Sequence, residues 1–181
     1  KDDVEVGLFE SLTNPAVPLP IYPLPQISEN LFLVPNTKKM YGFDIVTATM
    51  ARREDLLKKK LAKAKPYYDF IIIDCAPNKS LAAQNALTAS DYVLIPTQAE
   101  PSSYEGLFGI LETIELIRED CNENLKVLGV FFSMYNERLS ISKSVKEAVV
   151  GLFGDDVLSS TIRVNVALKE CQLNYQSIFD Y

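Results

Sequence analysis

The chain has 181 residues, of which 48% are hydrophobic and 23% charged, and its net charge is −6 at pH 7; these values are typical of one soluble globular domain, and the acidic balance provides no overall positive field for nucleic acid. Because the chain has no histidine, histidine bases, Ser-His-Asp triads and histidine-ligated zinc are excluded. The three cysteines lack metal-ligand spacing and favour free thiols in a cytoplasmic protein, and no apolar run approaches the roughly 20 residues that span a bilayer.

The first part of the chain predicts short elements around a proline-rich segment. Residues 7–13 fit a helix, and residues 31–35 fit a brief strand that ends at a proline. The prolines between them have fixed φ angles and no N–H groups, which predicts an extended surface segment over residues 14–30. Apolar residues at helical spacing predict one long helix over residues 42–65, which Pro66 ends.

From residue 69 onward, strands and helices alternate. The capping-box spacing of Ser102 and Glu105 predicts a helix that begins at residue 103. Because the strands are continuous apolar runs, we expect helices on both faces of the sheet. The alternation predicts a doubly wound, mostly parallel sheet in a single α/β domain, residues 1–181. The predicted strands are 69–74, 91–96, 125–134 and 160–162, and the predicted helices are 79–89, 103–120 and 141–152.

Asp74 stands directly after the apolar run of residues 70–73. In open α/β sheets, ligands bind beyond the carboxyl ends of the strands, and a carboxylate there can hold hydrated Mg²⁺. The alternative is that Asp74 caps the next loop or helix, since a position in a fold does not determine function. Cys75 points to the opposite face of the strand, and we interpret it as a small buried hydrophobic residue because no base is available to activate it.

Several motifs occur in an order and spacing that resemble one family. The chain is similar to the ParA/MinD (Soj-like) family of deviant-Walker ATPases, which partition chromosomes and plasmids. The resemblance covers residues 67–181 well and residues 7–66 loosely, and it implies a P-loop NTPase-like fold. The motifs that carry it are Tyr68–Pro77, Asn85–Gln98, Tyr104–Leu107, Gly129-Val130 with Met134-Tyr135-Asn136, and Ile162 with Asn165-Val166.

The resemblance also implies specific roles. Members of the family bind ATP and Mg²⁺, dimerise around two nucleotides, bind DNA nonspecifically and respond to a ParB-like partner, in the bacterial cytoplasm on the nucleoid. Asp74 matches the Walker B aspartate, a catalytic residue that holds Mg²⁺ through a water. Pro77 belongs to the loop that senses the γ-phosphate. Asn136 and Asn165 match positions that line the adenine pocket.

The chain departs from the family pattern at the phosphate loop. No Gly-rich loop with lysines occurs in these residues. Since the chain begins at Lys1 rather than at Met, we expect a fragment whose phosphate loop precedes Lys1, and whose final family helix would follow Tyr181. We therefore expect ATPase activity from the intact parent, and neither tight nucleotide binding nor hydrolysis from this chain alone. Loss of the phosphate-loop strand would bare sheet edges, which predicts self-association or a rearranged sheet.

The basic residues leave several interpretations open. The family's Pro-Arg-Asn-Val-Arg tract reads Arg-Val-Asn-Val-Ala over residues 163–167, so DNA contact is assigned to Arg163, Lys169 and Lys143. The lysines and arginines of residues 52–65 form either a solvated helix face or a phosphate-contacting patch. The altered arginines also leave open a non-catalytic regulatory or scaffold module with the ParA fold. A MinD-like membrane-surface ATPase is disfavoured, because the chain lacks that subgroup's C-terminal amphipathic helix.

Overall fold

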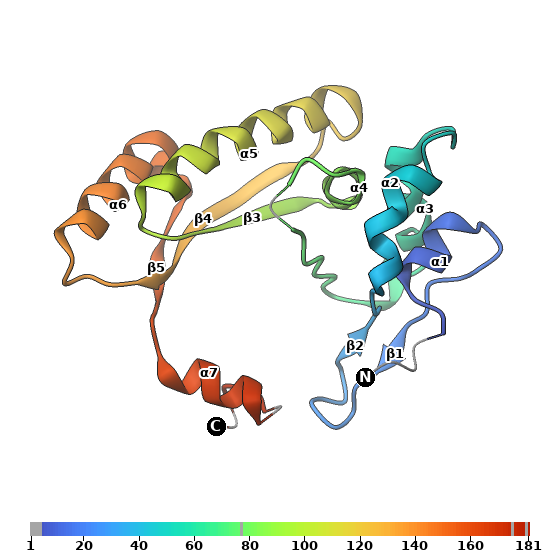
Figure 1. The fold of residues 1–181 in the computed structure, drawn as a ribbon, viewed down its shortest axis with the longest axis horizontal. Helices are drawn as coiled ribbons and strands as arrows, with labels where there is room; N and C mark the ends of the chain where they lie inside the picture. The colour runs from blue at the N-terminus through green and yellow to red at the C-terminus, as the bar shows by residue number, and fades with distance from the viewer. Residues whose placement is uncertain (1–4, 77, 175, 180) are drawn as a thin grey trace. The chain divides into compact units, whose positions relative to one another are not determined.

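The computed structural model describes residues 5–76, 78–174, 176–179 and 181, and the chain divides into two compact units (Figure 1). Unit 1 comprises Lys1–Ser90 and Ile117–Glu123, and unit 2 comprises Asp91–Leu116 and Asn124–Tyr181. The assignment of the whole chain to one α/β domain with a proline-rich surface segment stays a prediction. Within the described residues, no helix is long and apolar enough to cross a membrane.

Unit 1 is built from short helices and one small antiparallel ribbon of β1 and β2. The helix predicted over 7–13 and the strand predicted over 31–35 are confirmed with shorter bounds. The elements are α1 (Leu8–Thr13), β1 (Tyr22–Pro23), β2 (Phe32–Leu33), η1 (Lys38–Gly42), α2 (Phe43–Val46), η2 (Arg53–Asp55), α3 (Leu56–Leu61), η3 (Lys65–Tyr67) and α4 (Leu81–Ala89). The buried core comprises Leu12, Phe43, Leu57, Leu61, Leu81 and Ala89.

The long helix predicted over residues 42–65 is wrong, because the chain folds there into α2, η2, α3 and η3 with turns between them. Arg52 has a φ of 53°, a left-handed conformation that cannot continue a right-handed helix. The hydroxyl of Thr47, just after α2, donates a hydrogen bond to the carbonyl oxygen of Phe43 at 2.7 Å. The break brings Phe43 and Leu57 into one hydrophobic cluster, and such tertiary packing overrides helix propensity.

The strand predicted over residues 69–74 does not form, because this segment has no ladder partner among the described residues. Its side chains Phe70 and Ile72 are 88% and 92% exposed. An extended segment becomes a strand only when a neighbouring backbone completes its hydrogen bonds, and an apolar run carries no information about that neighbour. Cys75 is exposed as well, so the prediction that it is buried is wrong for the same reason.

Unit 2 contains a three-stranded sheet in the order β3-β4-β5, with both strand pairs parallel. This confirms the predicted α/β fold with a parallel sheet. Helix α5 begins two residues before the predicted start, with a proline in its first position, and its last four residues count with unit 1. The elements are β3 (Tyr92–Thr97), α5 (Pro101–Asp120), β4 (Lys126–Tyr135), α6 (Ser140–Phe153), η4 (Gly154–Asp156), β5 (Val157–Arg163) and α7 (Val166–Leu173).

The two crossover helices of unit 2, α5 and α6, lie on the same side of its strands (Figure 1). Right-handed connections between strands that are neighbours in both sequence and space place their helices on one face. Accordingly Ile95 is 2% exposed, whereas the alternate residues Tyr92 and Leu94 are 56% and 44% exposed. The expectation that helices cover both faces is therefore not met for these strands in the described part of the chain.

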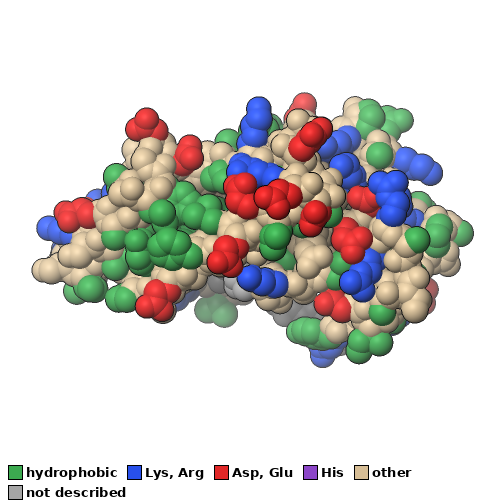
Figure 2. Space-filling view, turned by 90° about the horizontal axis from the view of Figure 1, so that it is seen from above, with side chains coloured by type: hydrophobic (Ala, Val, Ile, Leu, Met, Phe, Trp, Pro, Cys, Tyr) green, Lys and Arg blue, Asp and Glu red, His purple; other side chains and the backbone are tan. Residues whose placement is uncertain are grey.

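The outer side of α5 is acidic. Figure 2 views the side on which α5 and α6 lie, and acidic side chains gather there. The exposed acidic residues of this helix are Glu105, Glu112, Glu115, Glu119 and Asp120. A surface of this charge repels phosphate, so contacts to nucleic acid must be sought elsewhere on the molecule.

Strand β4 contains an irregularity at Gly129. The pairing of β3 with β4 shifts register between Val93 and Leu94, opposite this glycine. Gly129 has a φ of 158°, and an added Cβ would lie 2.9 Å from the carbonyl oxygen of Asp156 and 2.9 Å from Cδ2 of Leu158. The close approach of β4 to the start of β5 therefore requires glycine here.

Candidate functional site

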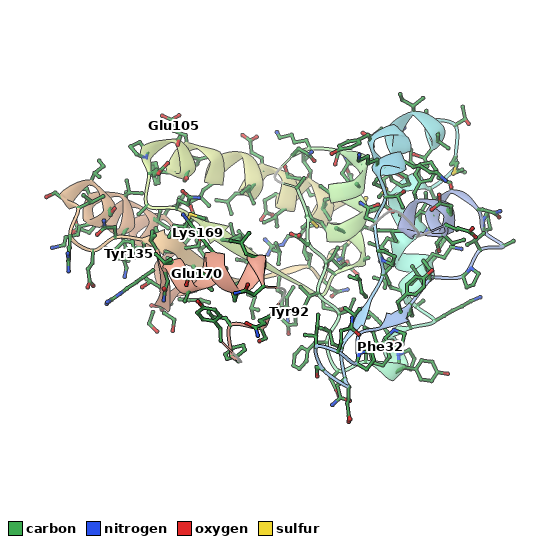
Figure 3. The ribbon with its side chains drawn as sticks, turned by 60° about the horizontal axis from the view of Figure 1, so that its bottom comes forward. Phe32, Tyr92, Glu105, Tyr135, Lys169 and Glu170 are labelled. Carbon is green, nitrogen blue, oxygen red and sulfur yellow. The ribbon has the colours of Figure 1, made fainter. Side chains whose placement is uncertain are left out.

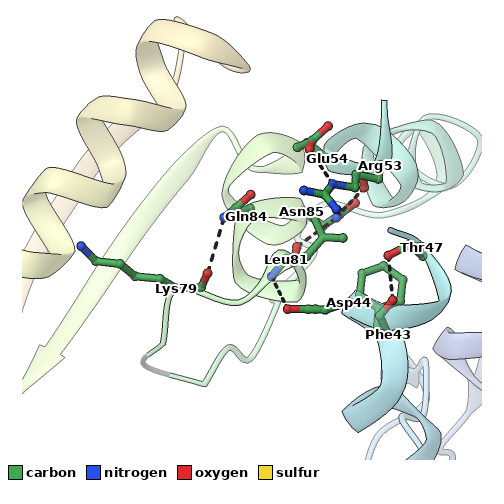
Figure 4. Close-up of polar contacts among 9 residues, drawn as sticks. All are labelled: Phe43, Asp44, Thr47, Arg53, Glu54, Lys79, Leu81, Gln84 and Asn85. Atoms are coloured by element: carbon green, nitrogen blue, oxygen red, sulfur yellow. Dashed lines mark hydrogen bonds and ion pairs between the residues drawn. The ribbon is translucent and has the colours of Figure 1, made fainter. Parts of the chain in front are cut away.

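The loop after Asp74 leads into α4, and its second half is held by hydrogen bonds. The side chain of Asn78 accepts the Ser80 N–H at 3.2 Å, and the Ser80 hydroxyl oxygen accepts the Ala83 N–H at 3.3 Å as the cap of α4. Asp44 of α2 accepts the N–H of Leu81 at 3.4 Å (Figure 4), which places a carboxylate at the helix N-terminus where its charge is favourable. Asp74 itself is exposed. Pro77 lies outside the described residues.

Asn85 ties α4 to the helices before it and so supports this loop (Figure 4). Its side chain is 1% exposed. The amide oxygen accepts the Leu57 N–H at 3.0 Å, and the amide nitrogen donates to the carbonyl oxygens of Arg53 at 2.8 Å and Leu81 at 3.0 Å. The N–H of Leu57 lies in the first turn of α3, where it has no partner within the helix. Asn85 is therefore a structural hub rather than a ligand-binding residue.

Cys75 does not have the properties of a nucleophile. Burial around the sulfur, and then the negative charge of Asp74, raise the pKa of the Cys75 thiol. Because the thiolate is the reactive form, a raised pKa lowers reactivity at neutral pH. The residue as a whole is exposed, so its reactivity is limited by charge and local environment rather than by access.

Asn136 and Asn165 follow the carboxyl ends of two neighbouring strands. Tyr135, the last residue of β4, pairs in register with Arg163, the last residue of β5. The Asn136 amide oxygen accepts the Arg138 N–H at 3.1 Å. The Asn165 amide oxygen accepts the Ala167 N–H at 3.0 Å in the first turn of α7, a helix that the sequence did not predict. The structure therefore brings these two predicted site residues to the same edge of the sheet.

The three residues assigned to DNA contact differ in their surroundings. Arg163 pairs with Glu137, its Nη2 lying 3.1 Å from Oε1, so its charge is compensated. Lys143 on α6 and Lys169 on α7 are exposed, and Lys169 is followed by Glu170 on the same helix (Figure 3). These three residues stay predictions as DNA contacts, with Arg163 the weakest of them.

Three residues of the basic run 52–65 make contacts within unit 1. Arg52 pairs with Asp55, and Arg53 pairs with Glu54 at 3.2 Å. The Lys60 ammonium donates to carbonyl oxygens in the turn formed by residues 14–17, and burial, and then the neighbouring charge of Lys63, lower the pKa of Lys60. These contacts give the three residues a structural role, and the interpretation of the other lysines stays a prediction.

Comparison with known proteins identifies the family. A family model described as an AAA domain matches residues 5–127. The sporulation initiation inhibitor protein Soj of Bacillus subtilis is 36% identical over all 181 residues, which span 71% of that protein. The chain belongs to the ParA/Soj family. The chromosome partitioning protein ParA of Myxococcus xanthus is 35% identical over 94% of this chain, which spans 60% of the relative's length.

The fold comparison agrees with the ParA/Soj assignment. Cobyrinic acid a,c-diamide synthase of Mycobacterium smegmatis, solved with an ATP analogue and magnesium, superposes with a TM-score of 0.82 at 29% identity, covering 91% of this chain and 65% of that one. The resemblance stated from the sequence motifs is thereby confirmed, as is the P-loop NTPase-like α/β fold.

The donor set available to a metal ion fits this family in one respect. Among the described residues, no group of three or more Asp, Glu, Cys or His side chains could hold a metal. Asp74 can contribute a single carboxylate. Mg²⁺ keeps several waters and is commonly bound through one or two carboxylates together with substrate phosphates, so Asp74 suits an ion that arrives with a nucleotide rather than a permanently bound metal.

Two side-chain contacts near the asparagines were not indicated by the sequence motifs. Glu137 forms the ion pair with Arg163, which is 26 residues away. Lys146 of α6 places its ammonium 5.2 Å from the ring centre of Tyr135. Neither contact has a local sequence signal, because each depends on the register of parallel strands and on the crossover helix. In a ParA/Soj chain, a charged residue next to Asn136 is nevertheless a candidate for such a contact.

Proposed function

We propose that the chain forms part of a ParA-type partitioning ATPase, which positions chromosomes, plasmids or other cargo in the bacterial cytoplasm. The observation that carries the proposal is the pairing of the β4 and β5 carboxyl ends, each followed by an asparagine, in a chain 36% identical to Soj over its whole length. Nucleotides bind at this edge of open α/β sheets. Nucleotide-dependent dimerisation and stimulation by a ParB-like partner belong to the same proposal.

In the proposed mechanism, each group has a distinct role. Mg²⁺, when bound with ATP, neutralises charge that develops on the phosphates. Asp74 orients a water of that ion, Pro77 and the loop up to the cap of α4 respond to the γ-phosphate, and Asn136 and Asn165 contact the adenine base. Because the 181 residues contain no phosphate loop, the chain by itself is proposed to be inactive, and the activity belongs to a polypeptide that supplies one.

Nonspecific DNA binding is the least supported part of the proposal. Lys143 and Lys169 are exposed cations that can approach a phosphate backbone, and such contacts are independent of sequence and sensitive to salt. Arg163 contributes less, because Glu137 already balances its charge.

The proposal is tested in the longest natural polypeptide that contains these residues. Mg²⁺-dependent release of phosphate from ATP is measured for the wild type, for Asp74→Ala and for Asp69→Ala. Asp69 is an exposed aspartate at the other end of the same segment, so it is a matched control for charge. We expect Asp74→Ala to lose hydrolysis and Asp69→Ala to retain it. Equal activity in all three proteins would contradict the role of Asp74.

The alternative of a non-catalytic scaffold makes the opposite prediction. The observation that favours it is the altered arginine tract of the family, which reads Arg-Val-Asn-Val-Ala over residues 163–167. If the natural polypeptide neither binds nor hydrolyses ATP yet remains folded, the scaffold is the better description.

A further inference from the structure

Arg163 and Glu137 tie the end of β5 to the loop that follows β4. One guanidinium nitrogen of Arg163, Nη2, lies 3.1 Å from Oε1 and 3.2 Å from Oε2 of Glu137. Arg163 is the last residue of β5 and pairs in register with Tyr135, the last residue of β4, whereas Glu137 lies two residues beyond Tyr135 in the following loop. The ion pair therefore links the loop after β4 to the end of β5 at the point where the backbone ladder ends.

Each loop carries an asparagine whose side chain is already oriented. The amide oxygens of Asn136 and Asn165 accept the N–H groups of Arg138 and Ala167 at 3.1 and 3.0 Å. An amide nitrogen has two N–H donors, and within the described residues neither asparagine donates a hydrogen bond through it. The amide nitrogens of Asn136 and Asn165 can therefore donate to a ligand that offers hydrogen-bond acceptors, as a purine ring does.

The end of β4, which leads into the first of these loops, is also held by its backbone conformation and by side-chain packing. Met134 has a φ of 52°, which is uncommon for a residue with a side chain and persists only where the surroundings determine it. The next residue, Tyr135, is 8% exposed, packs against Phe132 with ring centres 5.8 Å apart and lies beneath the Lys146 ammonium at 5.2 Å. Residues 134–138 are therefore anchored by the packing of Tyr135 and by the ion pair of Glu137.

We propose that the Glu137–Arg163 ion pair is a positioning element for the nucleotide base, which holds the loops of Asn136 and Asn165 at the spacing that the base requires. The inference rests on the proposed function, because it concerns the same site. It assigns Arg163 to the nucleotide site rather than to DNA. Glu137 and Arg163 act through the asparagines and need not touch the ligand themselves.

The charge balance explains why Arg163 is reassigned. A nearby carboxylate weakens the attraction of a cation to phosphate, because that attraction is largely electrostatic. Glu137 provides a carboxylate within hydrogen-bond distance of the guanidinium, so a phosphate would have to displace it. A loop-to-loop contact, by contrast, uses both charges and requires no displacement.

The test is a charge-reversal cycle in the longest natural polypeptide that contains these residues. The variants are Glu137→Arg, Arg163→Glu and the double reversal, with Lys126→Ala at the opposite end of β4 as a control for the loss of a charge away from the two loops. Affinity is measured for a fluorescent ATP analogue, with inorganic tripolyphosphate as a competitor that lacks the base. Because exposed pairs of this kind contribute up to about fivefold in an equilibrium constant, we expect each single reversal to weaken ATP binding about two- to fivefold.

The double reversal should return the ATP affinity to within about twofold of the wild type. In all three variants, competition by tripolyphosphate and binding of nonspecific DNA should change no more than in Lys126→Ala. Failure of the double reversal to restore ATP binding would overturn the inference. So would an equal loss of affinity for tripolyphosphate, since the ion pair would then act on the phosphates or on the whole fold. A loss of DNA binding in Arg163→Glu that the double reversal does not repair would also overturn it.

A second measurement needs no nucleotide. Amide hydrogen exchange of the Arg138 and Ala167 N–H groups reports the two asparagine turns directly in the 181-residue chain. We expect faster exchange in each single reversal and recovery in the double reversal; unchanged exchange would refute the coupling of the loops. If the wild-type natural polypeptide binds no ATP, the proposed function fails together with the base-positioning role, and the exchange rates alone decide whether the ion pair joins the loops.

Discussion

Replacing Asn85 with alanine is predicted to destabilise unit 1 more than any single surface change. The side chain is 1% exposed and makes three hydrogen bonds, to Leu57, Arg53 and Leu81. The carbonyl oxygen of Leu81 keeps its partner within α4 after the substitution, because it is also the acceptor for the backbone N–H four residues later. The Leu57 N–H and the Arg53 carbonyl oxygen lose theirs.

The magnitude follows from these two orphaned groups. Each buried group without a partner costs about 1–3 kcal/mol. Because Arg53 is only half-buried, its carbonyl falls at the low end, and the sum is about 3 kcal/mol. Asn85→Asp should lose at least as much, because it keeps the acceptor for Leu57 but turns a second oxygen toward two carbonyl oxygens.

A neighbouring residue on the same helix provides a matched control of opposite sign. Thr88 is 0% exposed, and its hydroxyl has no hydrogen-bond partner among the described residues. Thr88→Val keeps the shape of the side chain and removes the unsatisfied hydroxyl, so we expect a gain of about 1 kcal/mol.

Both changes are measured by urea unfolding followed by far-ultraviolet circular dichroism. With a slope of about 2 kcal/mol per molar urea, a loss of about 3 kcal/mol lowers the midpoint by about 1.5 M. A loss below about 1 kcal/mol in Asn85→Ala would refute the hub interpretation. A large loss in Thr88→Val would show instead that its hydroxyl has a partner.

Three further predictions concern other parts of the chain. Hydrogen bonds from Lys39 and from the backbone lower the pKa of Glu10 below its ordinary value of 4.5. The stabilisation that Glu10 contributes is therefore present above that pH and is lost as the pH falls through the lowered pKa. Glu10→Gln should be less stable than the wild type at pH 6 and equally stable at pH 2, and a constant difference across this range would contradict the assignment. Gly129→Ala should destabilise the protein by about 2 kcal/mol, because the new Cβ lies 2.9 Å from Leu158, and an unchanged urea midpoint would show that β5 moves away at no cost. Ile72 is 92% exposed in an unpaired extended segment, and such a residue should promote association. Sedimentation velocity should therefore show oligomers of the 181-residue chain, and Ile72→Lys should reduce their fraction. A wild-type chain that is monomeric at all concentrations would contradict this prediction.

The position in the fold of two candidate site residues could be predicted from local motifs, whereas their roles stay predictions. Asn136 and Asn165 were assigned from their family positions, and the structure places both beyond the ends of neighbouring strands. The contacts of Glu137 with Arg163 and of Lys146 with Tyr135 had no local sequence signal, because a contact between residues far apart in sequence depends on the tertiary fold. The continuous helix over residues 42–65 failed for a related reason: periodicity is a local property, whereas the break at Arg52 serves the packing of Phe43 with Leu57.

The sequence by itself determined the alternation of strands and helices from β3 to β5, the family and the position of Asp74, because apolar runs, turn residues and motif spacing are properties of short stretches of chain. Tertiary structure alone decided whether those stretches found partners. Residues 69–74 have every local feature of a buried strand, yet Phe70 stays exposed since a strand needs a neighbour that its own residues cannot provide. Likewise, Arg163 reads as a DNA contact along the chain and as the partner of Glu137 in space, because the parallel pairing of β4 with β5 brings the two charges together.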